Sequence, residues 1–137
     1  MGRQEVIWNL MLKASRVDDI AAVRVGAGCW RRDLSDGDGV RVWIVDMEAG
    51  STWPYVDDHD TGEHYYVVHG EVIEGDQRYG AGTYVRFAPS SSHRPKTDNG
   101  VRLFGFNLDV AAFAAARGGA VVRPGRSSSD RFNFSQG

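Results

Sequence analysis

Apolar and polar residues alternate along several short segments in the middle of the chain, and this period of two predicts β-strands. The clearest segment is Val40–Met47, which is rich in β-branched and aromatic residues and follows the turn-forming run Asp-Gly-Asp-Gly at 36–39. Turn signals containing glycine, proline or Asn-Gly delimit further predicted strands at His64–His69, Glu71–Glu74, Thr83–Ala88 and Val101–Leu108. Short strands at this spacing favour an all-β fold, either a sandwich or a small barrel.

The two ends of the chain have different patterns. The patches Val6–Leu12 and Asp18–Val25 fit a helix and a strand equally well. Alanine-rich Val110–Arg117 predicts one short helix, and the Gly-, Ser- and Arg-rich residues 118–137 predict a flexible tail, or one that packs its two phenylalanines on a partner. The predicted organisation is an N-terminal segment over 1–24 (a candidate dimerisation strand or helix), a barrel over 25–109, a helix over 110–117 and a tail over 118–137.

Composition narrows the class of protein. Glycine accounts for 17 of 137 residues, about 12% against a usual ~7%, and many tight turns suit an all-β chain. A formal net charge of −2 gives no general attraction to nucleic acid or to an anionic membrane. There is no apolar run long enough to span a bilayer and no signal-peptide pattern, so we expect a cytoplasmic protein. The sequence has a single cysteine, Cys29, which excludes an internal disulfide and a cysteine-rich zinc site. We expect Cys29 to be a small buried apolar residue.

Acidic residues are concentrated between positions 46 and 76. This stretch holds nine carboxylates and neither lysine nor arginine. It is either a set of solvated loops or a local field that attracts a cation. Because side chains two apart on a strand point the same way, Asp57 and His59 can face one ion, and a turn at 60–62 would let Glu63 approach from the next strand. His93, at the end of a later strand, is the other imidazole within reach.

Two imidazoles and two carboxylates that converge in this way would bind one divalent ion such as iron, zinc, manganese or nickel. The competing interpretation is a surface loop rich in aspartate and histidine. Spacing alone does not separate the two.

Two longer runs resemble the motifs of the cupin superfamily. Asp57-x-His59-x3-Glu63-x6-Gly70 is similar to the first cupin motif, and Gly82-x6-Pro89-x3-His93 is similar to the second. The nearer resemblance, over about 26–108, is to the ChrR-like cupins, through runs such as 30–33 (Trp-Arg-Arg-Asp), 61–63 (Thr-Gly-Glu) and 89–95 (Pro-Ser-Ser-Ser-His-Arg-Pro). The resemblance implies a small antiparallel β-barrel in jelly-roll order.

The resemblance also implies a set of metal ligands: Asp57, His59, Glu63 and His93. The sequence departs from the family at Asp57, where a histidine is usual. His59, His93 and one carboxylate would form a 2-His-1-carboxylate triad, with Asp57 as fourth ligand or with that position open. A degenerate site without metal is the alternative.

Other residues near these motifs have less specific signals. His64 should face away from the ion because it neighbours Glu63 on the same strand, and His69 lies beside the turn at Gly70. Tyr65 should share the face of Glu63, so it is our candidate for a catalytic or pocket residue. Arg86 is either a surface residue or a partner for a substrate carboxylate or enolate.

Three classes of function fit. The first is a metal-dependent enzyme acting on a small enolisable or aromatic ketone; a dioxygenase that cleaves a C–C bond is favoured over a non-oxidative isomerase or polyketide cyclase. The second is a ChrR-like regulatory module, disfavoured because about 24 residues and one cysteine cannot supply the zinc-binding helical domain of those anti-sigma factors. The third is a non-catalytic binder of small molecules. Exposed sheet edges and the apolar N-terminal residues favour a homodimer.

Overall fold

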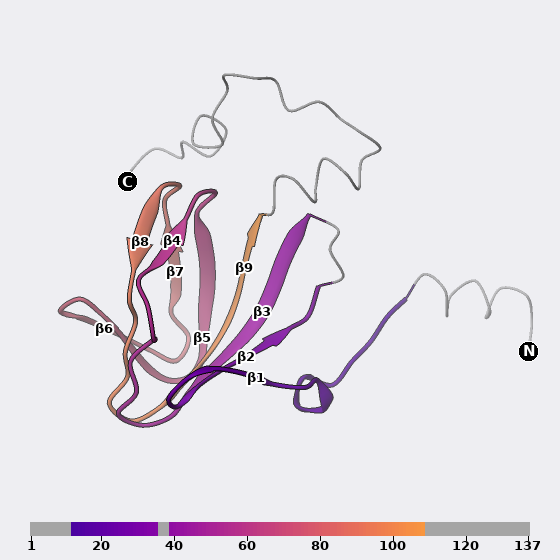
Figure 1. Cartoon of the computed structure of the whole chain (residues 1–137), viewed down its shortest axis with the longest axis horizontal. Helices are drawn as coiled ribbons and strands as arrows, with labels where there is room; N and C mark the ends of the chain where they lie inside the picture. The colour runs from indigo at the N-terminus through magenta and orange to yellow at the C-terminus, as the bar shows by residue number, and fades with distance from the viewer. Residues whose placement is uncertain (1–11, 36–38, 109–137) are drawn as a thin grey trace, which may run out of the picture.

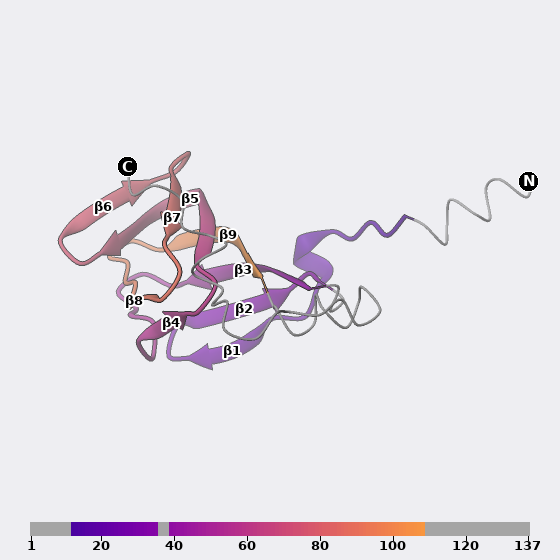
Figure 2. The ribbon, with the colours of Figure 1, turned by 90° about the horizontal axis from the view of Figure 1, so that it is seen from above.

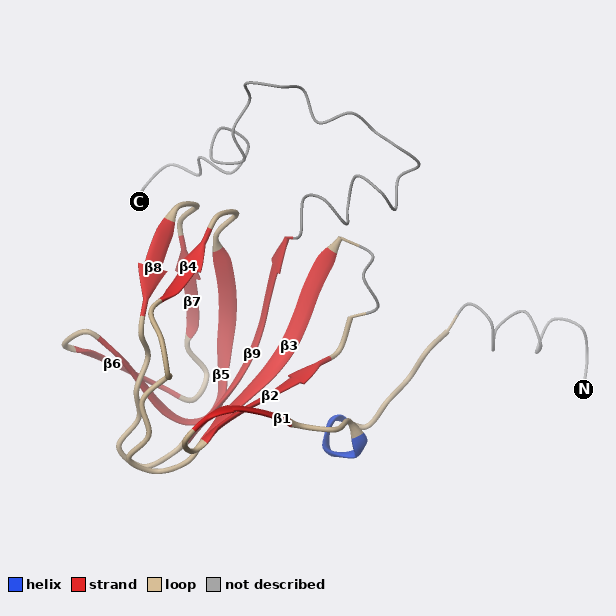
Figure 3. Cartoon of the chain, viewed as in Figure 1, coloured by secondary structure: helices blue, strands red, loops and turns tan. Residues whose placement is uncertain are grey.

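The structure is a computed structural model that describes residues 12–35 and 39–108. Within these ranges the chain is β-rich, with one turn of 3-10 helix and no α-helix (Figure 3). The elements are η1 (Val17–Asp19), β1 (Val23–Gly26), β2 (Cys29–Asp33), β3 (Val40–Met47), β4 (Asp57–His59), β5 (Glu63–Glu74), β6 (Gln77–Gly80), β7 (Tyr84–Phe87), β8 (Ser91–His93) and β9 (Val101–Leu108). The predicted helix over 110–117 and the predicted tail over 118–137 lie outside the described residues.

The strands form two antiparallel sheets. The larger has the order β1-β2-β3-β9-β5-β6, with β7 pairing with the first half of β5, and the smaller is the pair β4-β8. Figures 1 and 2 show that the large sheet is strongly curved and that the β4–β8 pair lies across its open side. The antiparallel all-β architecture predicted from the sequence is therefore confirmed for the described part of the chain.

The core lies on the concave face of the large sheet, where the alternation of β3 and β9 places its apolar side chains. In the register of these strands Val45 is paired with Leu103 and Met47 with Val101, and all four are buried. Trp43, the next inward residue on β3, is paired with Gly105. A Cβ atom at Gly105 would come within 2.3 Å of the Trp43 ring, so the glycine makes room for the indole.

One strand prediction was wrong at its boundary. The sequence predicted separate strands at His64–His69 and Glu71–Glu74, whereas β5 runs without a break from Glu63 to Glu74. Gly70 lies inside the strand with φ +80°, and a Cβ there would come within 2.1 Å of the Gly100 carbonyl oxygen. The glycine permits a close approach of two backbones rather than ending the strand.

A cluster of charged side chains joins the N-terminal elements to the outer face of the sheet. Arg102 donates to both carboxylate oxygens of Asp46, at 2.7 and 3.0 Å, and also to Asp18 in η1 at 3.1 Å. Arg32 donates to Asp46 and, at 3.0 Å, to the carbonyl oxygen of Ile20. These contacts hold η1 against β2, β3 and β9.

No helix among the described residues has the length and apolar character needed to cross a bilayer.

Candidate metal centre

The turn between β4 and β5 brings three of the predicted ligands together. Asp57 and His59 are alternate residues of β4, and Glu63 is the first residue of β5. Gly62 closes the turn with φ +83°, and its amide donates to the carbonyl oxygen of His59 at 3.3 Å. Any side chain at Gly62 would meet the Phe87 carbonyl oxygen at 2.7 Å, so the tight turn requires glycine.

His93 reaches the same place through the pairing of β4 with β8. In this short ladder Asp57 is paired with His93, and His59 with Ser91. The backbone amide of Ser90 also donates to the carbonyl oxygen of His59 at 2.7 Å, which fixes the start of β8. The second predicted motif therefore lies directly beside the first.

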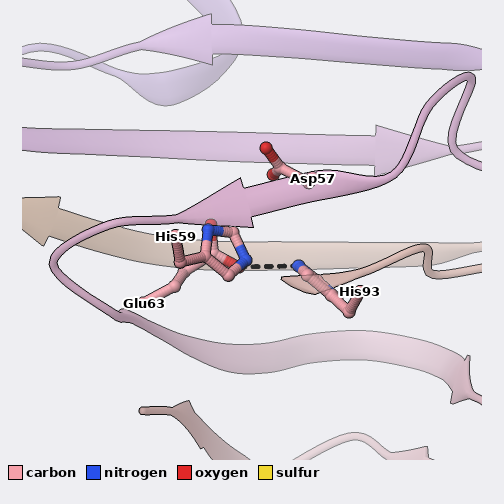
Figure 4. Close-up of side chains that lie close together, drawn as sticks. All are labelled: Asp57, His59, Glu63 and His93. Atoms are coloured by element: carbon pink, nitrogen blue, oxygen red, sulfur yellow. Dashed lines mark hydrogen bonds and ion pairs between the residues drawn. The ribbon is translucent and has the colours of Figure 1, made fainter. Parts of the chain in front are cut away.

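The four predicted ligands converge. One ligand atom from each of Asp57, His59, Glu63 and His93 lies within 4.8 Å of the others. Oε2 of Glu63 is 3.2 Å from Nε2 of His59 and 3.1 Å from Nε2 of His93. Figure 4 shows His59, Glu63 and His93 turned toward one another, with the Asp57 carboxylate standing apart from that group. The geometry thus brings together two imidazoles and one carboxylate, with a second carboxylate nearby.

Burial and the neighbouring charged groups act in opposite directions on the pKa values of this cluster. Burial would lower the pKa of His93, but hydrogen bonds to Glu63 and Glu74 outweigh it and raise that pKa to about 9. Burial would likewise raise the pKa of Glu63, but the two nearby imidazoles hold it below its ordinary value. Burial, followed by the charge of Glu63, raises the pKa of Asp57. Glu63 and the two imidazoles therefore stabilise one another's charged forms, whereas the Asp57 carboxylate is disfavoured by its surroundings.

One buried nitrogen tests whether the residues fit a metal ion. Nε2 of His59 is buried and has no hydrogen-bond partner within the described residues, despite its closeness to Glu63. A buried polar atom without a partner is uncommon and costs stability. An imidazole nitrogen beside a second imidazole and a carboxylate is also the donor set that zinc and iron accept. The residues present fit a divalent metal.

Glu74 was missed by the sequence analysis. Its carboxylate oxygens lie 2.8 and 2.9 Å from Nδ1 of His93, and one of them accepts a hydrogen bond from the Tyr65 hydroxyl at 2.7 Å. The contact keeps the proton of a neutral His93 on Nδ1 and leaves Nε2 facing Glu63. Glu74 is eleven residues after Glu63, an odd spacing that should place the two on opposite faces. The register of β5 shifts between Val67 and His69, and this bulge brings Glu74 back to the inner face.

The other residues named from the sequence lie on β5 and on its neighbour β7. Tyr65 is buried on the side of Glu63, and burial followed by the charge of Glu74 raises the pKa of its hydroxyl, which keeps it protonated. His64 faces away from the site, as predicted, where it stacks on Phe106 and contacts the Tyr84 hydroxyl. His69 is exposed. Arg86 is exposed, pairs with His64 in the strand register, and is not among the residues that line the cavity.

A cavity of about 150 Å³ opens onto the four predicted ligands. Its apolar lining includes Trp43, Trp53 and Leu103, and Tyr65 contributes to the same wall. Two arginines that the sequence analysis did not single out, Arg31 and Arg41, also line it. Arg31 lies in the run 30–33 that resembles the family, but nothing in the sequence marked it or Arg41 as a cavity residue, because only the curvature of the sheet brings β2 and β3 around the site.

Comparison with known proteins agrees with this geometry. The family model described as the ChrR cupin-like domain matches residues 12–111. The chain belongs to this cupin family. A search of curated proteins gave no match.

Solved structures share the fold at low sequence identity. One is a protein of unknown function with a cupin-like fold from Ralstonia eutropha JMP134, with 21% identity and a TM-score of 0.53 over 60% of this chain and 56% of that one. Another is the structure of Rhodobacter sphaeroides SigE in complex with the anti-sigma ChrR, with 19% identity and a TM-score of 0.60 over 67% of this chain and 50% of that one. A third is a candidate acetylacetone dioxygenase from Methylibium petroleiphilum PM1, with 17% identity and a TM-score of 0.61 over 71% of this chain and 76% of that one. This cupin therefore spans about half the length of the first two chains.

Proposed function

We propose that this cupin is a metal-dependent enzyme that acts on a small enolisable or aromatic ketone, and that it is a dioxygenase cleaving a C–C bond. The observation that carries the proposal is the convergence of His59, Glu63 and His93 in a buried site, with the unpartnered Nε2 of His59 among them. Two histidines and one carboxylate are the donor set of non-haem iron oxygenases. The likeness to a candidate acetylacetone dioxygenase supports the same reaction class.

In this proposal His59, Glu63 and His93 hold the ion, and Asp57 either completes its shell or leaves a place for substrate. A bound divalent ion would polarise the ketone oxygens and stabilise the enolate. Glu74 accepts a hydrogen bond from the Nδ1–H of His93, and this contact would present Nε2 to the ion. Trp43, Trp53 and Leu103 form an apolar part of the cavity wall, against which the carbon chain of a ketone would pack.

The proposed reaction needs no external reductant. One β-diketone and one O₂ would give one carboxylic acid and one 2-oxoaldehyde, so that both oxygen atoms are retained in the products. The test is oxygen uptake by the iron-loaded protein with a panel of β-diketones and hydroxyaryl ketones. We expect uptake in a one-to-one ratio with carboxylic acid formed by cleavage of the ketone. His93→Ala should abolish uptake, whereas the control His69→Ala, at an exposed histidine, should not.

A non-oxidative reaction is the second candidate, and the donor set supports it. Zinc accepts the same imidazoles and carboxylates as iron. With zinc the site would favour isomerisation or cyclisation of a ketone without oxygen. The outcome that replaces the dioxygenase proposal is conversion of an aromatic polyketide or a sugar by the zinc-loaded protein, with no ketone driving oxygen uptake by the iron-loaded protein. Tight binding without turnover in either form would instead indicate a sensing or binding cupin.

A further inference from the structure

A second group of polar side chains lines the same cavity as the predicted metal ligands. Arg41 on β3 and Asn107 on β9 are direct partners in the antiparallel ladder, and both contribute to the wall. Side chains at such paired positions lie close enough to bind one group together. Both come from strands outside the two cupin-like motifs.

The orientation of the Asn107 amide follows from its neighbour. The indole nitrogen of Trp43 donates to Oδ1 of Asn107 at 3.1 Å. Because an indole N–H is only a donor, the amide oxygen must face Trp43, and the amide NH₂ keeps its two hydrogens for another acceptor. Asn107 therefore offers donors to a ligand of the cavity.

Arg41 is the cation best placed to act with it. Arg31 also lines the cavity, but its Nε already donates to Asp33 at 3.0 Å. Arg41 makes no hydrogen bond or ion pair with the residues that the structure describes, although it lies close enough to Asp57 for its charge to act on that carboxylate, and Asp58 lines the same cavity. If Asp57 serves as a metal ligand, its charge is committed to the ion, and the Arg41 guanidinium remains available.

We propose that Arg41 and the Asn107 amide form a carboxylate-binding subsite, so that the substrate is a small oxo-carboxylate rather than a neutral diketone. This inference rests on the proposed function, since it assigns the ketone end of the substrate to the metal side of the cavity. A planar guanidinium and an amide NH₂ are both donors, and a carboxylate is an acceptor only. The subsite would select among ketones of similar size by charge.

Two probes that differ only in charge at one end test the subsite. Both 4,6-dioxoheptanoate and heptane-2,4-dione carry the same β-diketone, and a carboxylate in the first replaces a methyl group in the second. Binding is measured by calorimetry on zinc-loaded protein, which avoids oxidative turnover, and the metal content of every sample is measured. We expect the carboxylate to bind at least about 10-fold more tightly, as a charge-assisted hydrogen bond allows.

Arg41→Gln should reduce this ratio to about one and leave the affinity for heptane-2,4-dione and the metal content unchanged. Arg24→Gln, at an exposed arginine of β1 away from the cavity, is the matched control and should keep the full ratio. Equal binding of the two probes by the wild-type protein, no binding of either, or a preference that survives Arg41→Gln would overturn the subsite. A preference that depends on Arg41 in protein that takes up no metal would support the subsite and contradict the proposed function, so the two failures are distinguishable.

Discussion

The candidate metal centre is built from individual side chains that come from three strands. His59 and His93 are both buried or nearly so, and their nitrogens meet at one carboxylate oxygen of Glu63. Removing either imidazole leaves two donors at most from the triad. Affinity for a divalent ion should then fall steeply, because each ligand would contribute to a shared shell.

We predict that His59→Ala and His93→Ala each lose most of the bound metal. Elemental analysis of protein purified without chelator measures the metal-to-protein ratio directly. His69→Ala, at an exposed histidine, should retain the wild-type ratio. Unchanged stoichiometry in both cavity variants would contradict the assignment of the site.

Glu74 gives a second prediction at the same scale. Glu74→Gln keeps the shape of the side chain but removes the charge that orients the Nδ1–H of His93, and we expect metal affinity to fall about 10- to 100-fold. Competition with a chelator of known affinity measures this change. Glu71→Gln, on the same strand but paired with Arg78 at the surface, is the control and should leave affinity unchanged. Equal affinity in the two variants would show that the Glu74 contact does not act on the metal.

At the scale of elements, the paired strands β3 and β9 set both the core and the cavity wall. The Trp43 ring lies over Gly105, and the indole N–H of Trp43 in turn fixes the orientation of the Asn107 amide. A methyl group at Gly105 would overlap the indole, and the carbonyl oxygen of His64 lies at 2.7 Å on the other side. Neither neighbour can move far, since both belong to the central sheet.

We therefore predict that Gly105→Ala lowers the free energy of unfolding by about 1–3 kcal/mol, the usual range for overpacking a core. Urea denaturation measures this change. Gly75→Ala is an informative comparison, because a Cβ at Gly75 meets no atom within 4 Å and its cost comes from backbone conformation alone (φ +62°). A fully stable Gly105→Ala protein would mean that β3 and β9 adapt more than their close pairing indicates.

The sequence predicted best the strands that are long, rich in β-branched or aromatic residues and preceded by a turn signal. Val40–Met47 and Val101–Leu108 have these features, and both have the same bounds in the structure. β4 and β8, with three residues each, are too short for a period to be recognised. Their residues were found instead through ligand spacing and family resemblance.

The cavity contributions of Arg41 and Glu74 could not be predicted in this way. Arg41 looks like any exposed arginine until the sheet curves, and Glu74 changes face only because β5 contains a bulge. Both facts depend on tertiary structure. Ligand spacing and family resemblance together therefore located the candidate ligands, but not the groups that act around them.

For the whole molecule, the outer face of the large sheet is the feature that still needs an explanation. The centre of that face exposes large apolar side chains of β5, β7 and β9: Tyr66, Val68, Tyr84, Phe104 and Phe106. An exposed apolar patch of this kind commonly marks a contact surface. Because every copy carries the same patch in the middle of a sheet, two copies can pack face to face about a twofold axis.

We predict a homodimer that buries this face, with a solution mass about twice 15.1 kDa by light scattering at micromolar concentration. Phe106→Glu should shift the mass to that of one chain, while Glu71→Gln should not. A wild-type mass near 15.1 kDa would contradict the dimer and would leave another segment or partner as the cover of the face.

The bulge in β5 also has a consequence for how this protein is compared with its relatives. A single extra residue between Val67 and His69 decides whether the carboxylate that holds His93 points inward. Insertion or deletion of one residue there is therefore a larger functional change than most substitutions, although an alignment records it as a minor gap. In relatives whose strand has the regular length, we expect the partner of the last histidine ligand at a position of the same parity as Glu63, and an alignment column at Glu74 would then compare residues on opposite faces of the sheet.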